Sequence, residues 1–334
     1  MSDGRRVTSA DVAREAGVSR ATVSYVLNAV PHQKIPEATR QRVWEAADRL
    51  GYAPSAAARA LRTGRSEIVL GLLPDWPIEH VLGHLIQQLT NAFAEHGLTF
   101  VVHSSSHPAR PLRDIWKTMT PAAVLALQDF ADPEAEAMRA AGIEVVMAMH
   151  GAAAPDGEAQ SPLVSEQPIG ALQARHLAGP HRRLGYAYPD LPGLDVLAQP
   201  RLDGVRKACA ELGFPEPDVR TVPLDGAGAA EAVRGWLAAD PPVTGVCAFN
   251  DDIALAVLAG LHHLGLRAPR DLAVIGVDDI PTASLAQPPL TTVARDTAVI
   301  ARGLARRVVD ALQGRETLAA PVRDELLIRV RESA

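Results

Sequence analysis

Hydrophobic residues recur with helical spacing in three short segments near the N-terminus. Gly17 and Gly51 follow the first and the third segment, and glycine suits the left-handed turn that ends a helix. Thr8 and Ser19 precede the first and the second segment, where a hydroxyl can cap a helix. The pattern predicts helices over Ala10–Ala16, Arg20–Asn28 and about Glu37–Leu50.

From Glu67 onward, short apolar runs alternate with segments of helical periodicity. Such alternation predicts parallel sheets covered by helices, here two doubly wound α/β lobes behind an all-α head. We expect Leu290–Val293 to lead the chain back into the first lobe, helix Thr297–Gln313 to belong there, and strand Glu325–Val330 to return to the second. The other predicted strands are Ile68–Leu73, Thr99–His103, Ala123–Leu127, Glu144–Met149, Leu184–Tyr188, Val219–Val222, Val243–Phe249 and Leu272–Val277.

Composition is that of an ordinary globular protein, with 47% hydrophobic and 22% charged residues in 334. No apolar run reaches the roughly 18 residues of a membrane-spanning helix, so no membrane partner is expected. The N-terminal residues carry two arginines with no apolar segment behind them, which indicates a cytoplasmic protein. Cys209 and Cys247 show no CxxC spacing, so neither a disulfide framework nor a cysteine zinc site is expected.

Charge is distributed unevenly along the chain. Residues 1–65 hold 11 basic and 6 acidic side chains, whereas the remainder holds 22 basic and 33 acidic ones. A basic head on an acidic body is expected when only the head meets a polyanion.

The first two predicted helices are joined by Gly17, Val18 and Ser19, which fits a helix-turn-helix. The second helix carries Arg20 and Tyr25 away from its apolar side, and an arginine there can bind guanine through two hydrogen bonds in the major groove. The alternative is a plain three-helix bundle with a solvated polar face.

The segment from Pro54 to Gly64 reads as a helix too short to be stable alone. Its one large apolar residue is Leu61, which lies between Arg59 and Arg62. A leucine so placed can act as a wedge in the minor groove, with the arginines near phosphates. The alternative is a helical linker whose leucine packs on the body.

Together, VTSADVAREAGVSRATVSYVLN and RVWEAADRLGYAPSAAARALRTGRS resemble the DNA-binding head and hinge of the lactose-repressor (LacI) family. In the body, RLDGVRKA, AFNDDIALAVLAGLHHLGL, DLAVIGVDD and PPLTTV resemble its ligand domain in order and spacing. The resemblance implies a homodimeric transcriptional regulator, expected to be a repressor, with a periplasmic-binding-protein-like body. It would bind a pseudo-palindromic DNA operator and sense a small-molecule effector in the cleft between its lobes.

The resemblance also implies roles for individual residues of the head. Arg20, Ala21 and Tyr25 would read bases, and Ala58 and Leu61 would enter the minor groove. The residues that would hold the DNA backbone or support that docking are Thr8, Ser19, Thr22, Ser24, Asn28 and Tyr52.

In the body, polar side chains follow the ends of predicted strands, where ligands of such sheets bind. The family resemblance makes Arg201, Asn250, Asp251 and Asp278 candidate effector ligands. Trp76 is a candidate for an apolar or stacking wall of the effector site. The alternatives are that Asp251 caps its helix and that Arg201 pairs with an acid. The acid common at the start of the second lobe appears here as Glu166.

Enzymatic and metal chemistry find little support in the sequence. His80 and His84 have the spacing of metal ligands but no evident third ligand, and the glycines at 226 and 228 lack the third glycine of a dinucleotide loop. We therefore predict no catalytic residues, no metal and no cofactor. The competing function is a cytoplasmic small-molecule sensor without sequence-specific DNA binding.

The predicted organisation is a DNA-binding domain over residues 1–53, a hinge over 54–65 and an effector-binding and dimerisation domain over 66–334. Within that domain we expect lobe one over about 66–164 and 294–319, and lobe two over about 165–293 and 320–334.

Overall fold

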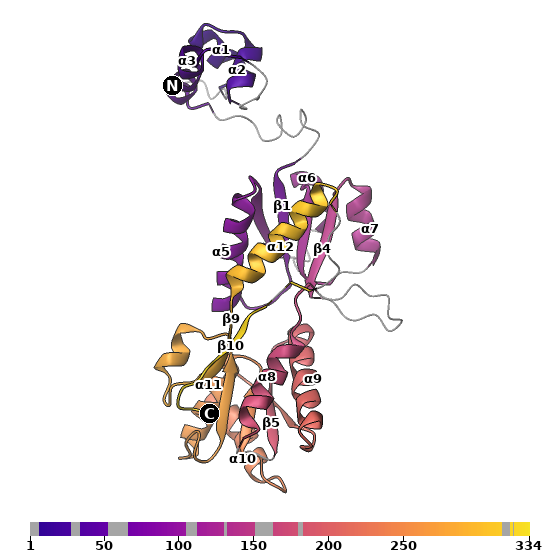
Figure 1. The fold of residues 1–334 in the computed structure, drawn as a ribbon, viewed down its shortest axis with the longest axis vertical. Coiled ribbons are helices and arrows are strands. Elements are labelled where there is room, and N and C mark those ends of the chain that lie inside the picture. The colour runs from indigo at the N-terminus through magenta and orange to yellow at the C-terminus, as the bar shows by residue number, and fades with distance from the viewer. Residues whose placement is uncertain are drawn as a thin grey trace. The chain divides into compact units, whose positions relative to one another are not determined.

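A computed structural model describes residues 7–27, 34–52, 66–104, 112–129, 132–150, 163–179, 183–315, 321–322 and 324–334. The chain divides into two compact units, Met1–Glu67 and Ile68–Ala334. Asn28, Ala58, Leu61 and the predicted hinge lie outside the described residues. The prediction of an α/β fold with an N-terminal helical head is confirmed (Figure 1).

The N-terminal unit, the head, is a cluster of short helices. Gly17 adopts φ 65° and its amide caps the first helix, as its place after the apolar stripe predicts. Small and branched side chains fill the centre, with Val12, Val23 and Val43 fully or almost fully buried. The helices are α1 (Ser9–Ala16), α2 (Arg20–Leu27) and α3 (Glu37–Leu50).

Lobe one of the body is built on a parallel sheet with the order β2-β1-β3-β4. Helices α5 and α12 lie side by side against one face, and Ile115, Trp116 and Met138 of α6 and α7 pack against the other (Figure 1). Its elements are β1 (Ile68–Leu73), α5 (His80–Ala94), β2 (Thr99–Ser104), α6 (Leu112–Met119), β3 (Ala123–Gln128), α7 (Asp132–Ala140), β4 (Val145–His150) and α12 (Thr297–Leu312).

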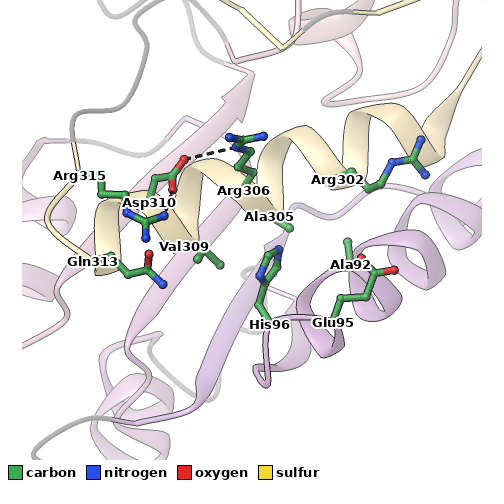
Figure 2. A pocket seen from close by; sticks show the side chains of 10 residues that line it. All are labelled: Ala92, Glu95, His96, Arg302, Ala305, Arg306, Val309, Asp310, Gln313 and Arg315. Carbon is green, nitrogen blue, oxygen red and sulfur yellow. Dashed lines mark hydrogen bonds and ion pairs between the residues drawn. The ribbon is translucent and has the colours of Figure 1, made fainter.

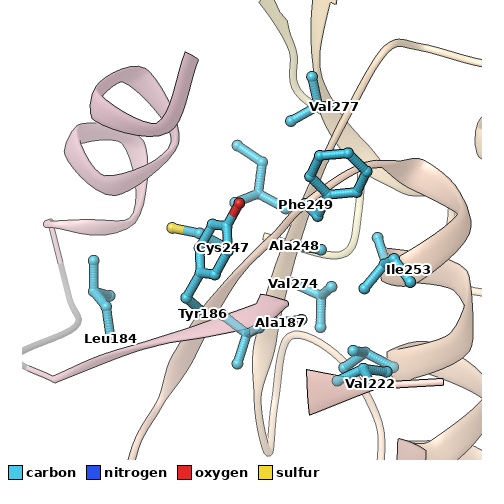
Figure 3. Close-up of a cluster of buried hydrophobic side chains, with 14 of the residues drawn as sticks. Leu184, Tyr186, Ala187, Val222, Cys247, Ala248, Phe249, Ile253, Val274 and Val277 are labelled. Atoms are coloured by element: carbon cyan, nitrogen blue, oxygen red, sulfur yellow. The ribbon is translucent and has the colours of Figure 1, made fainter. Parts of the chain in front are cut away.

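Lobe two has a sheet of order β10-β9-β8-β7-β5-β6, parallel except for the β10–β9 pair. Its core is continuous, with Tyr186, Cys247 and Phe249 close together (Figure 3). Its elements are α8 (Gln167–Leu177), β5 (Leu184–Pro189), α9 (Asp195–Glu211), β6 (Asp218–Val222), α10 (Gly226–Leu237), β7 (Gly245–Ala248), α11 (Asp251–His263), β8 (Ala273–Val277), the 3-10 helix η1 (Pro281–Leu285), β9 (Thr291–Arg295) and β10 (Leu326–Arg329).

Two sequence expectations need correction. Leu290–Val293 does not yet lead back into lobe one, because Thr291 and the residues after it form β9, paired with β8 and β10 in the lobe two sheet. The crossing follows Arg295, and α12 then packs into lobe one. The sequence also predicts a helix over Gln199–Leu212, but α9 begins at Asp195, since Pro200 lies inside the helix instead of opening it.

Candidate functional site

The exposed face of α2 in the head carries the predicted base-reading side chains. Arg20, Ala21 and Tyr25 are all exposed, and Tyr25 retains 38% of its accessible surface. On the opposite side of α2, Val23 and Val26 are buried in the head core. Helix α2 therefore presents one arginine and one tyrosine to solvent, an arrangement that suits readout in the major groove.

Two hydroxyl residues of the head, Thr8 and Ser19, belong to helix caps. The Thr22 amide donates to Ser19 Oγ at 3.0 Å, which places Ser19 at the N-cap of α2. The Thr8 amide and hydroxyl both donate to Asp11 Oδ2, at 3.0 and 2.6 Å. Helix N-termini attract phosphate. The N-terminal ends of α1 and α2 therefore offer backbone amides as well as hydroxyl groups to such a ligand. Ser24 and Tyr52 are half-buried, and Tyr52 packs against the head core.

In the body, a cavity of about 100 Å³ lies where the carboxyl ends of strands from both lobes meet. Four of the predicted effector ligands line it: Trp76, Arg201, Asn250 and Asp278. The remaining side chains of the lining are Pro77, Glu79, Val81, Leu82, Leu85, Leu127, Met149, His150, Glu166, Leu194, Leu197, Phe249 and Arg295.

Glu166 is at the centre of a buried charge network that forms part of the cavity wall. Arg201 donates to Glu166 Oε2 at 2.8 Å and to the Phe249 carbonyl at 2.7 Å. Arg295 donates to Glu166 Oε1 at 2.8 Å, and its other nitrogens bind Asp324 at 2.6 and 3.1 Å. Burial alone would raise the pKa of Glu166, but the two guanidinium groups hold it well below its ordinary value. Glu166 is therefore an anion that both arginines share.

His150 lies against this network and is 4% exposed. Its Nδ1 is 4.0 Å from Glu166 Oε1. Burial lowers the pKa of His150 to about 4; the nearby Glu166 opposes that shift, and Arg295 adds to it. His150 is thus neutral near pH 7.

Asn250 joins the two lobes across the cavity. Its Oδ1 accepts from the Ile253 amide at 3.0 Å and so caps α11, while its Nδ2 donates to Glu79 Oε2 at 3.2 Å. Burial raises the pKa of Glu79 to about 7, and the negative charges of Asp252 and Asp278 add to the shift. Trp76 makes a second link between the lobes, since its Nε1 donates to the Gly193 carbonyl at 2.9 Å.

Asp278 follows β8 with φ 103°, a backbone conformation that non-glycine residues adopt rarely and mostly at functional sites. Its amide donates to the Val293 carbonyl at 2.7 Å. Its Oδ1 is buried and has no hydrogen-bond partner within the described part of the chain. Burial raises the pKa of this carboxyl, although Arg201 and Arg295 lower it. Asp278 Oδ1 is therefore a hydrogen-bond acceptor that a ligand in the cavity can use.

Asp251 lies away from the cavity lining. It is fully buried, accepts from the Thr292 hydroxyl at 2.6 Å and accepts from the Ile280 amide at 2.9 Å. A Cβ at Gly276 would overlap with its Oδ1, so the missing side chain makes room for this carboxyl. Asp251 fixes the loop that carries Asp278.

Sequence reasoning missed several residues of the cavity. Glu79, His150 and Arg295 were not candidates, and Glu166 was noted only as a departure from the family pattern. His150 and Arg295 end β4 and β9, so the rule of strand ends could have found both.

A second hollow, of about 410 Å³, lies on lobe one between α5 and α12 (Figure 2). Asp310 there pairs with Arg315 at 3.1 Å and with Arg306 at 3.7 Å. This hollow contains none of the predicted effector ligands.

No cluster of three or more potential metal ligands occurs among the described residues. His84 instead contacts Thr297 at 3.0 Å and Gln88 at 3.1 Å through its ring nitrogens. No helix in the described ranges is both long and apolar enough to cross a membrane.

Comparisons with known proteins match both units. The profile described as bacterial regulatory proteins, lacI family, matches residues 8–55, and that of the periplasmic binding protein-like domain matches residues 174–334. The HTH-type transcriptional regulator CelR of Thermobifida fusca is 30% identical over 344 residues and covers 100% of each chain. Catabolite control protein A of Priestia megaterium is 27% identical over 95% of each chain.

Solved structures agree with these relatives. A transcriptional regulator CelR–cellobiose complex is 29% identical, with a TM-score of 0.68 over 98% of this chain and 100% of that one. A lac repressor dimer bound to operator and the anti-inducer ONPF has a TM-score of 0.77 at 22% identity, over 98% of this chain and 99% of that one. The second likeness shows the shared fold alone.

Proposed function

The chain belongs to the lacI family of bacterial regulatory proteins, and we propose that it represses transcription by binding a pseudo-palindromic operator as a homodimer. A small-molecule effector in the cleft between its lobes controls that binding. The observation that carries the proposal is the exposed face of Arg20, Ala21 and Tyr25 on α2, in the same chain as a two-lobed body with a polar cavity.

At the operator, Arg20, Ala21 and Tyr25 read bases in the major groove. Two heads related by a two-fold axis read the two halves of the site. Ala58 and Leu61 enter the minor groove, with Leu61 as the wedge that bends the DNA. Contacts to the DNA backbone, or support for them, come from Thr8, Ser19, Thr22, Ser24, Asn28 and Tyr52.

In the cleft, Asn250 and Asp278 bind the effector directly and Trp76 forms one wall. Arg201 orients the site through Glu166, and Asp251 acts by holding the loop of Asp278. Because the Asn250–Glu79 and Trp76–Gly193 contacts both join the lobes, a ligand that replaces or strengthens them shifts the lobe angle. A differential affinity of about 1–3 kcal/mol between the two angles suffices to change DNA binding.

The relatives are transcriptional regulators rather than enzymes, and we extend this to the chain as a regulator without catalytic activity. A protein that binds a chromosomal operator acts in the cytoplasm. We propose that residues 1–53 form the DNA-binding domain, residues 54–65 the hinge, and residues 66–334 the domain for effector binding and dimerisation.

Selection of bound duplexes from random sequence tests the proposal. We expect the full-length protein to enrich a two-fold symmetric site. Retention of all sequences alike, with and without candidate metabolites, would contradict it and favour a sensor that does not read DNA.

A further inference from the structure

We propose that the effector carries a positive charge and that its ammonium group lies between the carboxylates of Glu79 and Asp278. This inference rests on the proposed effector site and adds the chemical class of its ligand. The two carboxylates come from different lobes and line the same cavity.

The positive charges already present in the cavity each have an acidic partner. All three nitrogens of the Arg201 guanidinium contact Glu166 or the Phe249 carbonyl, at 2.7–2.8 Å. All three nitrogens of Arg295 contact Glu166 or Asp324. The guanidinium groups therefore pair with Glu166 and Asp324, and no hydrogen bond from either of them to Asp278 or Glu79 is seen among the described residues.

Glu79 and Asp278, in contrast, form no ion pair with a basic side chain in the described ranges, although the more distant Arg201 lowers the pKa of both. Asp278 Oδ1 is buried without a partner in the described chain, and Glu79 receives one hydrogen bond from a neutral amide, that of Asn250. Asp252 adds a third carboxyl close enough to raise the pKa of Glu79. A bound cation would relieve the mutual repulsion of these groups, whereas an anion would increase it.

The rest of the lining offers a ligand little else to bind with. The Trp76 Nε1–H is occupied by the Gly193 carbonyl, one N–H of Asn250 Nδ2 is occupied by Glu79, and His150 is buried and neutral. A polyol would need several donors and acceptors in the lining, whereas a cation needs acceptors alone, which the ionised Glu79 and Asp278 supply. The apolar part of a ligand would instead contact Leu82, Leu194, Leu197 and Phe249.

The volume of the cavity limits the size of the ligand. Small-molecule sites usually enclose about 300–1,000 Å³, but this one encloses about 100 Å³ with the lobes as they stand. A compact alkyl ammonium ion fits such a volume better than a disaccharide does.

The test compares three probes of one shape and different charge: cyclohexylamine, cyclohexanol and cyclohexanecarboxylate. Their dissociation constants are measured on the full-length protein at pH 7 by calorimetry and by the shift in melting temperature. We expect the ammonium ion to bind at least about tenfold more tightly than the alcohol. Glu79→Gln and Asp278→Asn should each remove that preference, and Glu136→Gln, an exposed acid on α7, should keep it.

Equal or tighter binding of the alcohol or the carboxylate, or absence of binding by all three probes, overturns the proposal. So does an ammonium preference that survives both cavity variants. The ranking of probes on the unmodified protein decides the matter even where a variant fails to fold. Duplex selection separates the two proposals: a protein that selects a DNA site but shows no ammonium preference retains the proposed function and loses only the ligand class.

Discussion

Gly204 on α9 lies directly against the backbone carbonyl of Gln167 on α8, so closely that a Cβ at position 204 would overlap with that oxygen. Gly170 on α8 is placed in the same way against the carbonyl of Arg201. These two glycines let the helices approach closely, and Arg201 thereby reaches Glu166. Gly204 follows Arg201 by three residues, so this spacing in the sequence allows the close packing that positions the charge network.

Gly204→Ala should therefore destabilise the body. The added methyl group meets backbone rather than a flexible side chain, and overpacking of this kind costs about 1–3 kcal/mol. Gly83→Ala on α5 is the matched control, because nothing lies within 4 Å of its Cβ and alanine favours a helix. Chemical denaturation should show a loss for the first variant and no loss for the second; equal stability would contradict the close approach.

Glu166→Gln should cost about 3–5 kcal/mol of unfolding free energy. Its removal leaves two buried guanidinium groups without the anion they share, and breaking a buried ion pair has that magnitude. Glu211→Gln is the control, since the Arg175–Glu211 pair has the same 2.8 Å separation on the surface. Exposed pairs contribute roughly 0–1 kcal/mol. Similar losses for both variants in urea titrations would refute the importance of burial.

Much of the fold could be predicted because its elements are local patterns. Helix Glu37–Leu50 and strand Ile68–Leu73 are observed with the predicted bounds. The strand-end rule also found Asn250 and Asp278, which line the cavity. It could not separate them from Asp251, because the direction of that side chain depends on the space left by Gly276.

Other parts of the cavity depend on distant contacts. Glu79 precedes a helix, and only its hydrogen bond to Asn250, 171 residues away in the chain, reveals that it faces lobe two. The return to lobe one was placed too early for a similar reason. Strand β9 is assigned to lobe two by pairing with β10 near the C-terminus, which no local pattern indicates.

Glu79→Gln should change the pH dependence of stability. The pKa of Glu79 is raised from its ordinary value to about 7, so its protonated form favours folding. That contribution is complete below about pH 4.5 and is lost as the pH rises through about 7. Glutamine resembles the protonated acid at every pH. The melting temperature of the variant relative to the unmodified protein should therefore increase from pH 5 to pH 8, while Glu136→Gln should show no such trend. A constant difference would mean that Glu79 titrates normally.

Arg20→Ala should weaken binding to the selected operator by roughly 1–3 kcal/mol and relax the preference at one base pair in each half-site, because a bidentate contact to guanine has that value. Arg42→Ala, an exposed arginine on α3, is the control for loss of charge alone. Affinities on the operator and on each single-base variant separate the two effects. A uniform loss on every duplex would assign Arg20 to the phosphates instead. Because non-specific binding depends on counter-ion release, the titrations need a fixed salt concentration, and each lost phosphate contact reduces the salt slope by about 0.9.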